Sequence, residues 1–97
     1  MNLKELKCLY DARKSFYGKA KVMTQDIGTT GYKEMVLYSY GTMVAKIIEG
    51  KGKRKYIYYG KYSQTTTRHQ KEFFKQYGLS DKEIKQLFND GIMEKEV

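Results

Sequence analysis

Alternating apolar and polar positions predict β-strands through the first two thirds of this chain. The stretches with this character, rich in β-branched and aromatic residues, are residues 19–24, 34–40, 42–49 and 54–59. Gly41 separates two of them as a hairpin turn or a kink, and Gly50 and Gly52 mark a further turn. Connections this short predict an antiparallel meander.

After Tyr62 the apolar spacing changes to a helical period. Ser63 or Thr65 is a suitable N-cap, and Gly78 suits the residue that follows a helix. Between them, Phe73, Phe74 and Tyr77 form a stripe that can lie on a sheet. Ser80 and Glu83 have the spacing of a capping box, which predicts a second, short helix.

The N-terminal segment, residues 2–16, also predicts a helix, because Leu3, Leu6 and Leu9 fall near one stripe. The expected fold is therefore α+β. An antiparallel sheet of three to four strands carries a C-terminal helix packed on one face, followed by a short helix. A chain of 97 residues forms a single domain, residues 1–97.

Strand alternation divides this sheet into two faces. We expect one to be the core, because its side chains are mostly aliphatic: Met35, Leu37, Met43, Ala45, Ile47 and Ile57. The opposite face carries a set of tyrosines, which are Tyr38, Tyr40, Tyr56 and Tyr58. Such rings stack unpaired bases, form protein interfaces, or simply pack within the sheet, since tyrosine favours strands.

Composition narrows the class of protein. The absence of proline and the 40% hydrophobic content argue against disorder. No apolar run is long enough to span a membrane, and the first ten residues lack the apolar run of a signal peptide. Cys8 is the single cysteine, which excludes an internal disulfide and a multi-cysteine zinc site. We expect a cytoplasmic protein.

Positive charge is concentrated in one part of the sequence. Residues 51–75 contain eight Lys or Arg and one acid, Glu72, and the whole chain has a net charge of +8. A surface of this kind attracts phosphates. The alternative is that these lysines merely keep the surface soluble.

Two segments of this basic region are candidate phosphate contacts. The first is a hairpin tip with Lys51, Lys53, Arg54 and Lys55. The alternative is that this tip is only a solvated loop. The second is the start of the long helix, where unpaired backbone N–H groups favour anions. Its side chains are Lys61, Ser63, Thr65, Thr66 and Arg68, although capping alone also explains the hydroxyls.

The residues predict no catalytic site. No Ser-His-Asp arrangement, phosphate-binding glycine loop or paired carboxylates can be recognised. His69 and Glu72 have the spacing for a shared metal, but no further ligand pattern supports one, and His69 is better read as a structural side chain. We expect neither an enzyme nor a cofactor.

Three stretches together resemble a known group of proteins. They are RKSFYGKA at 13–20, SYGTMVA at 39–45, and YSQTTTRH at 62–69 followed by Glu72 and Phe73. They resemble small uncharacterised proteins of phages, plasmids and integrative elements of low-GC Gram-positive bacteria. The resemblance covers about residues 10–79 and implies a genomic context without any known activity.

The primary hypothesis is a nucleic-acid-binding accessory protein of a phage or mobile element. It would hold DNA or RNA, duplex or single strand, through the basic hairpin and the helix N-terminus. One alternative is an inhibitor that binds a host protein or ribonucleoprotein, as anti-CRISPR proteins do. Another is an assembly protein that dimerises through its sheet. No membrane partner is expected.

Overall fold

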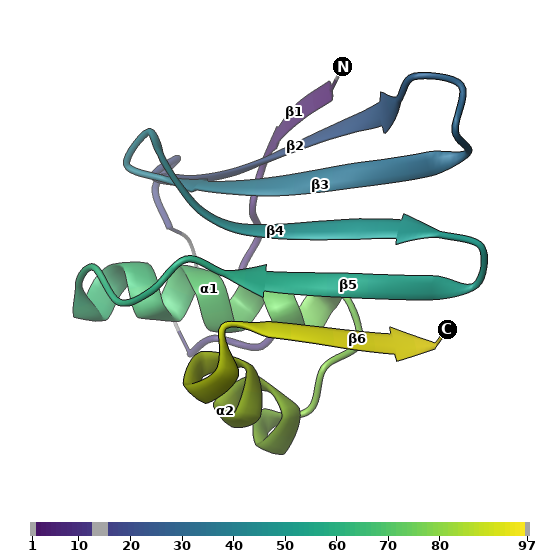
Figure 1. Cartoon of the computed structure of the whole chain (residues 1–97). Coiled ribbons are helices and arrows are strands. Elements are labelled where there is room, and N and C mark those ends of the chain that lie inside the picture. Colours follow the sequence, from purple (N-terminus) through teal and green to yellow (C-terminus); the bar gives the residue numbers. More distant parts are fainter. Residues whose placement is uncertain (1, 13–15, 97) are drawn as a thin grey trace.

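The fold consists of one six-stranded antiparallel sheet and two helices (Figure 1). It was obtained as a computed structural model that describes residues 2–12 and 16–96. In chain order the elements are β1 (Asn2–Glu5), β2 (Ala20–Ile27), β3 (Tyr32–Ser39), β4 (Thr42–Gly50), β5 (Lys53–Tyr58), α1 (Gln64–Gln76), α2 (Asp81–Asp90) and β6 (Ile92–Glu96). The predicted α+β class is confirmed, whereas three to four strands is too few.

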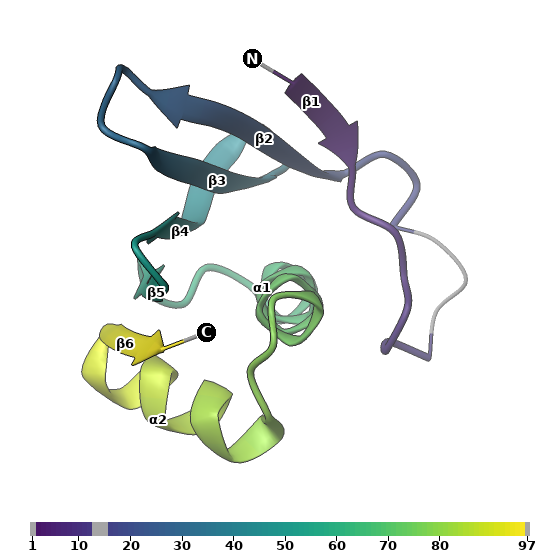
Figure 2. The ribbon, with the colours of Figure 1, turned by 90° about the vertical axis from the view of Figure 1, so that its right-hand side faces the viewer.

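Each strand pairs with the strand before and after it in the order β1-β2-β3-β4-β5-β6. Both helices pack on the same side of this sheet (Figure 2). Tyr56 and Tyr58, two residues apart on β5, contact Phe74 of α1 and Phe88 of α2 respectively. Residues two apart on a strand share a face, so one face meets both helices. We call the other side of the sheet the open face.

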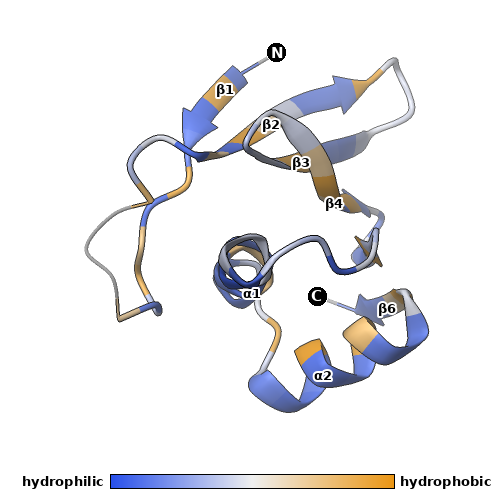
Figure 3. Ribbon diagram, turned by 90° about the vertical axis from the view of Figure 1, so that its left-hand side faces the viewer, coloured by the Kyte–Doolittle hydropathy of each residue, from blue (hydrophilic) through white to orange (hydrophobic). Residues whose placement is uncertain are grey.

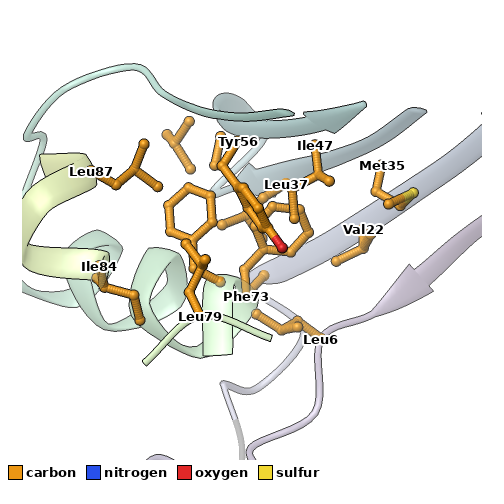
Figure 4. Close-up of a cluster of buried hydrophobic side chains, with 14 of the residues drawn as sticks. Leu6, Val22, Met35, Leu37, Ile47, Tyr56, Phe73, Leu79, Ile84 and Leu87 are labelled. Carbon is orange, nitrogen blue, oxygen red and sulfur yellow. The ribbon is translucent and has the colours of Figure 1, made fainter. Parts of the chain in front are cut away.

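The hydrophobic core lies between the sheet and the two helices (Figure 4). Thr24, Met35, Ile47 and Tyr56 are successive cross-strand partners on the helix side of the sheet. Phe73 and Phe74 of α1, and Ile84 and Leu87 of α2, complete the cluster from the other side. The helical stripe predicted at Phe73 and Phe74 is thus buried.

A β-bulge in β4 changes which residues face the core. Leu37 pairs with Ala45, but the next residue, Tyr38, pairs with Met43, which leaves Val44 as an extra residue. Val44 and Ala45 are both buried, and Gln70 of α1 donates a hydrogen bond to the Val44 carbonyl at 3.0 Å. Met43, which strict alternation assigned to the core, is instead 40% exposed.

The assignment of β5 to the two faces was also wrong. Ile57 pairs with Lys46 on the open face, whereas Tyr56 pairs with Ile47 and is fully buried. The Tyr56 hydroxyl donates to the Tyr77 carbonyl at 2.7 Å, so a buried tyrosine here leaves no unpaired polar atom. A shift of one residue moves every side chain of a strand to the other face.

In its described residues, 2–12 and 16, the N-terminal segment is a strand followed by an irregular stretch, so the helix predicted over residues 2–16 is wrong there. Residues 2–5 form β1, in which Leu3 pairs with Met23 of β2. Leu6 then enters the core. Residues 13–15 of the predicted helix lie outside the described part of the chain. Pairing with β2 outweighs a helical spacing that only a few leucines support.

The caps of both helices are confirmed. The Ser63 hydroxyl accepts a hydrogen bond from Thr66 N at 3.1 Å, so Ser63 is the N-cap of α1. Ser80 and Glu83 form the complete capping box at α2. Gly78, with φ 96°, follows the end of α1.

No helix in residues 2–12 and 16–96 is long and apolar enough to cross a bilayer.

The α2 capping box predicts a dependence of stability on pH. Hydrogen bonding to the Ser80 backbone, followed by the Lys95 side chain, lowers the pKa of the Glu83 carboxyl. A group with a depressed folded pKa stabilises the fold above its unfolded pKa, about 4.3, and this contribution is lost as pH falls through the folded value.

We therefore expect urea unfolding midpoints to fall between about pH 5 and pH 3, and to fall less steeply in Glu83→Gln. The comparison is needed because other carboxyls titrate over the same range. Identical pH slopes for the variant and the native sequence would show that Glu83 does not contribute.

Candidate nucleic-acid interface

The two segments predicted to contact phosphates lie at opposite ends of the fold. The turn between β4 and β5 carries the basic hairpin at one end of the sheet, whereas α1 starts at the other (Figure 1). Chain direction requires this, because β5 runs the length of the sheet before the helix begins. The structure therefore does not bring the hairpin and the helix N-terminus into one site.

Acidic side chains lie beside the cations of the hairpin. Arg54 forms an ion pair with Glu49 at 3.2 Å and donates to the Tyr77 carbonyl at 2.7 Å, so its guanidinium joins the sheet to α1. Lys53 lies 3.8 Å from Glu94 of β6. Since β6 was not predicted, its carboxylates could not be placed here from the sequence.

The remaining hairpin lysines lie on the open face. Lys55 is exposed and pairs across the sheet with Glu94. Lys51 lies over the Tyr32 ring at 5.6 Å. Nearby carboxylates reduce the attraction of this end for phosphate.

At the start of α1, two of the three predicted hydroxyls have internal partners. Ser63 caps the helix, and the Thr66 hydroxyl is buried and lies 2.9 Å from Ser39 Oγ. Thr65 is half-buried. Lys61 and Arg68 are exposed, so they are the predicted side chains best placed to meet a ligand.

Cations from other segments also lie at the end of the molecule where α1 begins. Figure 3 looks onto it, with α1 seen along its axis. Here residues 17–21, 38–44 and 58–69 meet: Tyr40 N bonds to Lys19 O, and Tyr59 N to Val44 O. These residues, all within the described chain, include no Asp or Glu but four cations: Lys19, Lys21, Lys61 and Arg68. We call this region the acid-free end. Acids of neighbouring segments border it: Glu5 accepts a hydrogen bond from Gly18 N at 3.1 Å and is the cross-strand partner of Lys21, and Asp11 and Glu72 share a pocket with Arg68.

Four exposed tyrosines also belong to the acid-free end. Their exposed fractions are 80% for Tyr17, 58% for Tyr40, 52% for Tyr62 and 38% for Tyr59. Tyr17 and Tyr40 both have φ 52° and precede a glycine that also has positive φ. Turns of this geometry favour asparagine or glycine in the first position. The backbone of both tyrosines is therefore strained, as is that of Lys51 in the β4–β5 turn at φ 55°.

A cleft of about 530 Å³ opens on the open face at this end. Tyr38 and Tyr40 line it together with Lys19 and Lys21, and Leu3 and Met23 contribute apolar surface. Tyr38 pairs with Lys21 across the β2–β3 ladder. Aromatic, apolar and cationic side chains therefore border one cavity.

His69 supports the turn that carries Tyr40. Its Nδ1 lies 2.7 Å from Ser39 Oγ, its ring meets Phe16 edge-on at 4.5 Å, and its centroid is 5.8 Å from that of Tyr40. Glu72 is used elsewhere, accepting hydrogen bonds from Tyr10 N and Asp11 N, each at 2.8 Å. In residues 2–12 and 16–96 no three potential ligands group around a metal position.

The predicted tyrosine face does not exist as one surface. Tyr56 is in the core, and Tyr58 stacks on Phe88 with centroids 4.3 Å apart, where burial raises the pKa of its phenol. Tyr38 and Tyr40 do share the cleft. Sequence reasoning missed Lys19, Lys21 and the exposed Tyr17 as site residues. The repeated Tyr-Gly pair, at 17–18 and 40–41, was the available signal.

Comparison with known proteins identifies the family without assigning an activity. No curated protein and no solved structure matches the chain. The model of one family, described as a family of unknown function (DUF8033), matches residues 4–90. Since this match spans most of the 97 residues, the protein belongs to the DUF8033 family of unknown function.

Proposed function

We propose that this protein binds nucleic acid through its acid-free end, as an accessory protein of a phage or other mobile element. The observation that carries the proposal is the coincidence of four exposed tyrosines and four cations on three segments that themselves contain no Asp or Glu, with the nearest carboxylates on neighbouring segments. Lysine and arginine neutralise phosphates, and aromatic rings stack on bases.

Two further features support this location. The backbone N–H groups at the start of α1 lie at the same end and favour anions. The basic hairpin is the weaker candidate, because Glu49 and Glu94 lie beside Arg54 and Lys53. Local charge balance, rather than the number of lysines in a sequence segment, decides where phosphate is attracted.

Salt dependence tests the proposal. Fluorescence anisotropy with labelled DNA and RNA oligonucleotides between 50 and 200 mM salt is expected to give a log–log slope of about −3, since each phosphate contact contributes about 0.7 to 0.9. Electrostatic binding is strongest at low salt. If no DNA or RNA binds at about 50 mM salt, the proposal is wrong.

A second candidate is an inhibitor that binds a host protein or ribonucleoprotein. A cross-strand row on the open face favours it: Leu3, Met23 and Val36 lie on one side of Lys46, with Ile57 and Ile92 on the other. Leu3 is 56% and Ile92 49% exposed, and exposed apolar surface often marks a protein contact. A stoichiometric partner retained from host lysate after nuclease treatment would favour this candidate. A dimer in light scattering would instead indicate that a second copy covers the row.

A further inference from the structure

We propose that the cleft bordered by Tyr38 and Tyr40 takes an unpaired nucleobase, so that the ligand is a single strand rather than a duplex. The inference rests on the proposed function, because it specifies the kind of nucleic acid that the acid-free end binds. The cleft provides a pocket for the base beside the charged surface of the acid-free end.

The shape and lining of the cleft suit a base. Its volume of about 530 Å³ is within the range of small-molecule sites. Tyr38 and Tyr40 supply aromatic rings from β3 and the turn after it, while Leu3 and Met23 supply apolar surface. Bases have apolar faces that stack on such rings with little regard to sequence.

The charges around the cleft suit the phosphates on either side of that base. Lys19 precedes β2 and Lys21 lies within it, and both border the cavity and are exposed. The Lys19 carbonyl also accepts a hydrogen bond from Tyr40 N at 2.8 Å, so the backbone segments that carry this cation and this ring are held side by side. A strand that places a base in this cleft thus brings its backbone near the lysines.

A duplex cannot use this arrangement. Its bases are stacked on one another, and their faces become available only where the strands separate. A duplex offers its phosphates alone, which the lysines attract but the tyrosines do not. The cleft therefore predicts discrimination between single strand and duplex.

The backbone of Tyr40 provides a selective variant for the test. Its φ of 52° lies in the left-handed region, in a two-residue hairpin turn completed by Gly41 at φ 82°. Asparagine is the favoured residue at this position. The chain instead holds a ring there, 58% exposed and beside the cleft. Tyr40→Asn consequently removes the ring while keeping a residue that the turn accepts.

The opposite end of the open face provides a matched control. Tyr32 borders a smaller cleft with Lys51, Lys53 and Lys55, but Glu94 borders it too. Tyr32→Ala removes the same chemical group from a basic cleft that has a carboxylate beside it. We expect little effect of this variant on nucleic-acid affinity.

The test compares a labelled single-stranded oligonucleotide with the duplex of the same sequence. Thermal unfolding first establishes that Tyr38→Ala, Tyr40→Asn and Tyr32→Ala are folded. The native protein should bind the single strand at least about fivefold more tightly, and Tyr38→Ala and Tyr40→Asn should each weaken that binding by about 5- to 150-fold, the range for loss of one stacked base. Duplex binding should change little in either variant.

The possible failures are distinguishable. Equal affinity for both forms, or single-strand binding unchanged in Tyr38→Ala and Tyr40→Asn, would overturn the base-binding cleft while leaving nucleic-acid binding intact. Loss of binding in Tyr32→Ala alone would place the base at the other end and would also overturn the inference. No binding of either form at about 50 mM salt would overturn the proposed function along with it.

Discussion

Reversing the charge of Lys19 and Lys61 together, as Lys19→Glu with Lys61→Glu, is expected to weaken nucleic-acid binding by at least about 60-fold at about 50 mM salt. Each lysine is exposed at the acid-free end. Without its lysine, a phosphate keeps its condensed counterion, and each such phosphate lowers the salt slope by about 0.7 on a single strand. Repulsion between the new carboxylates and the phosphates weakens binding further. The log–log salt slope should become shallower by about 1.4.

Lys51→Glu with Lys55→Glu is the matched control, because it makes the same change in net charge at the opposite end of the sheet. Both residues are exposed, so neither pair of substitutions should unfold the protein. A uniform effect of net charge would weaken binding equally in the two variants. If the hairpin variant binds more weakly than the variant at the acid-free end, the hairpin is the site and our assignment is wrong.

Glu72→Ala is expected to lower the free energy of unfolding by about 3 kcal/mol and the Tm by about 15 °C. The Glu72 carboxylate is 2% exposed. One oxygen accepts hydrogen bonds from Tyr10 N and Asp11 N, and the other accepts one from Gln76 Nε2 at 2.6 Å. Glu72 thereby holds the N-terminal segment against α1. Its removal leaves the two backbone N–H groups and the Gln76 amide without their charged acceptor.

Asp81→Ala is the comparison for this prediction. Asp81 forms an ion pair with Lys75 of α1 at 2.8 Å, but its side chain is 84% exposed, and exposed pairs contribute less than about 1 kcal/mol. Glu72→Gln should fall between the two, since the amide retains one acceptor. Denaturant unfolding measures all three. Equal destabilisation by Glu72→Ala and Asp81→Ala would mean that the buried hydrogen bonds do not stabilise the fold.

Features that depend on neighbouring residues could be predicted from the sequence. The bounds of β3, β4 and β5 were predicted within two residues, because their β-branched and aromatic residues are consecutive, whereas β2 extends three residues beyond its predicted end. The caps at Ser63 and Ser80 were predicted because a hydroxyl and the N–H groups that it binds lie within one helical turn. These elements need no knowledge of distant parts of the chain.

Features that depend on pairing or position in space could not be predicted. β1 and β6 are short edge strands, and the charged residues of β6 give no core-facing pattern strong enough to reveal it. The bulge at Val44 is visible only as a shift in the ladder. The acid-free end was the hardest feature to predict, because its residues come from three segments that lie together only in the folded chain. Counting charge along the chain pointed instead to the hairpin.

The meander also bears on how the chain reaches its native state. Strands β1 to β5 can each be added next to the strand just formed, so most of the sheet assembles from contacts close in sequence, and such contacts favour rapid folding. The pairing of β6 with β5 is different, since both helices intervene between them. During synthesis from the N-terminus, the last strand can complete the sheet only after the helices have emerged. Until then β5 is an edge strand whose row of unpaired backbone groups is open to unwanted association.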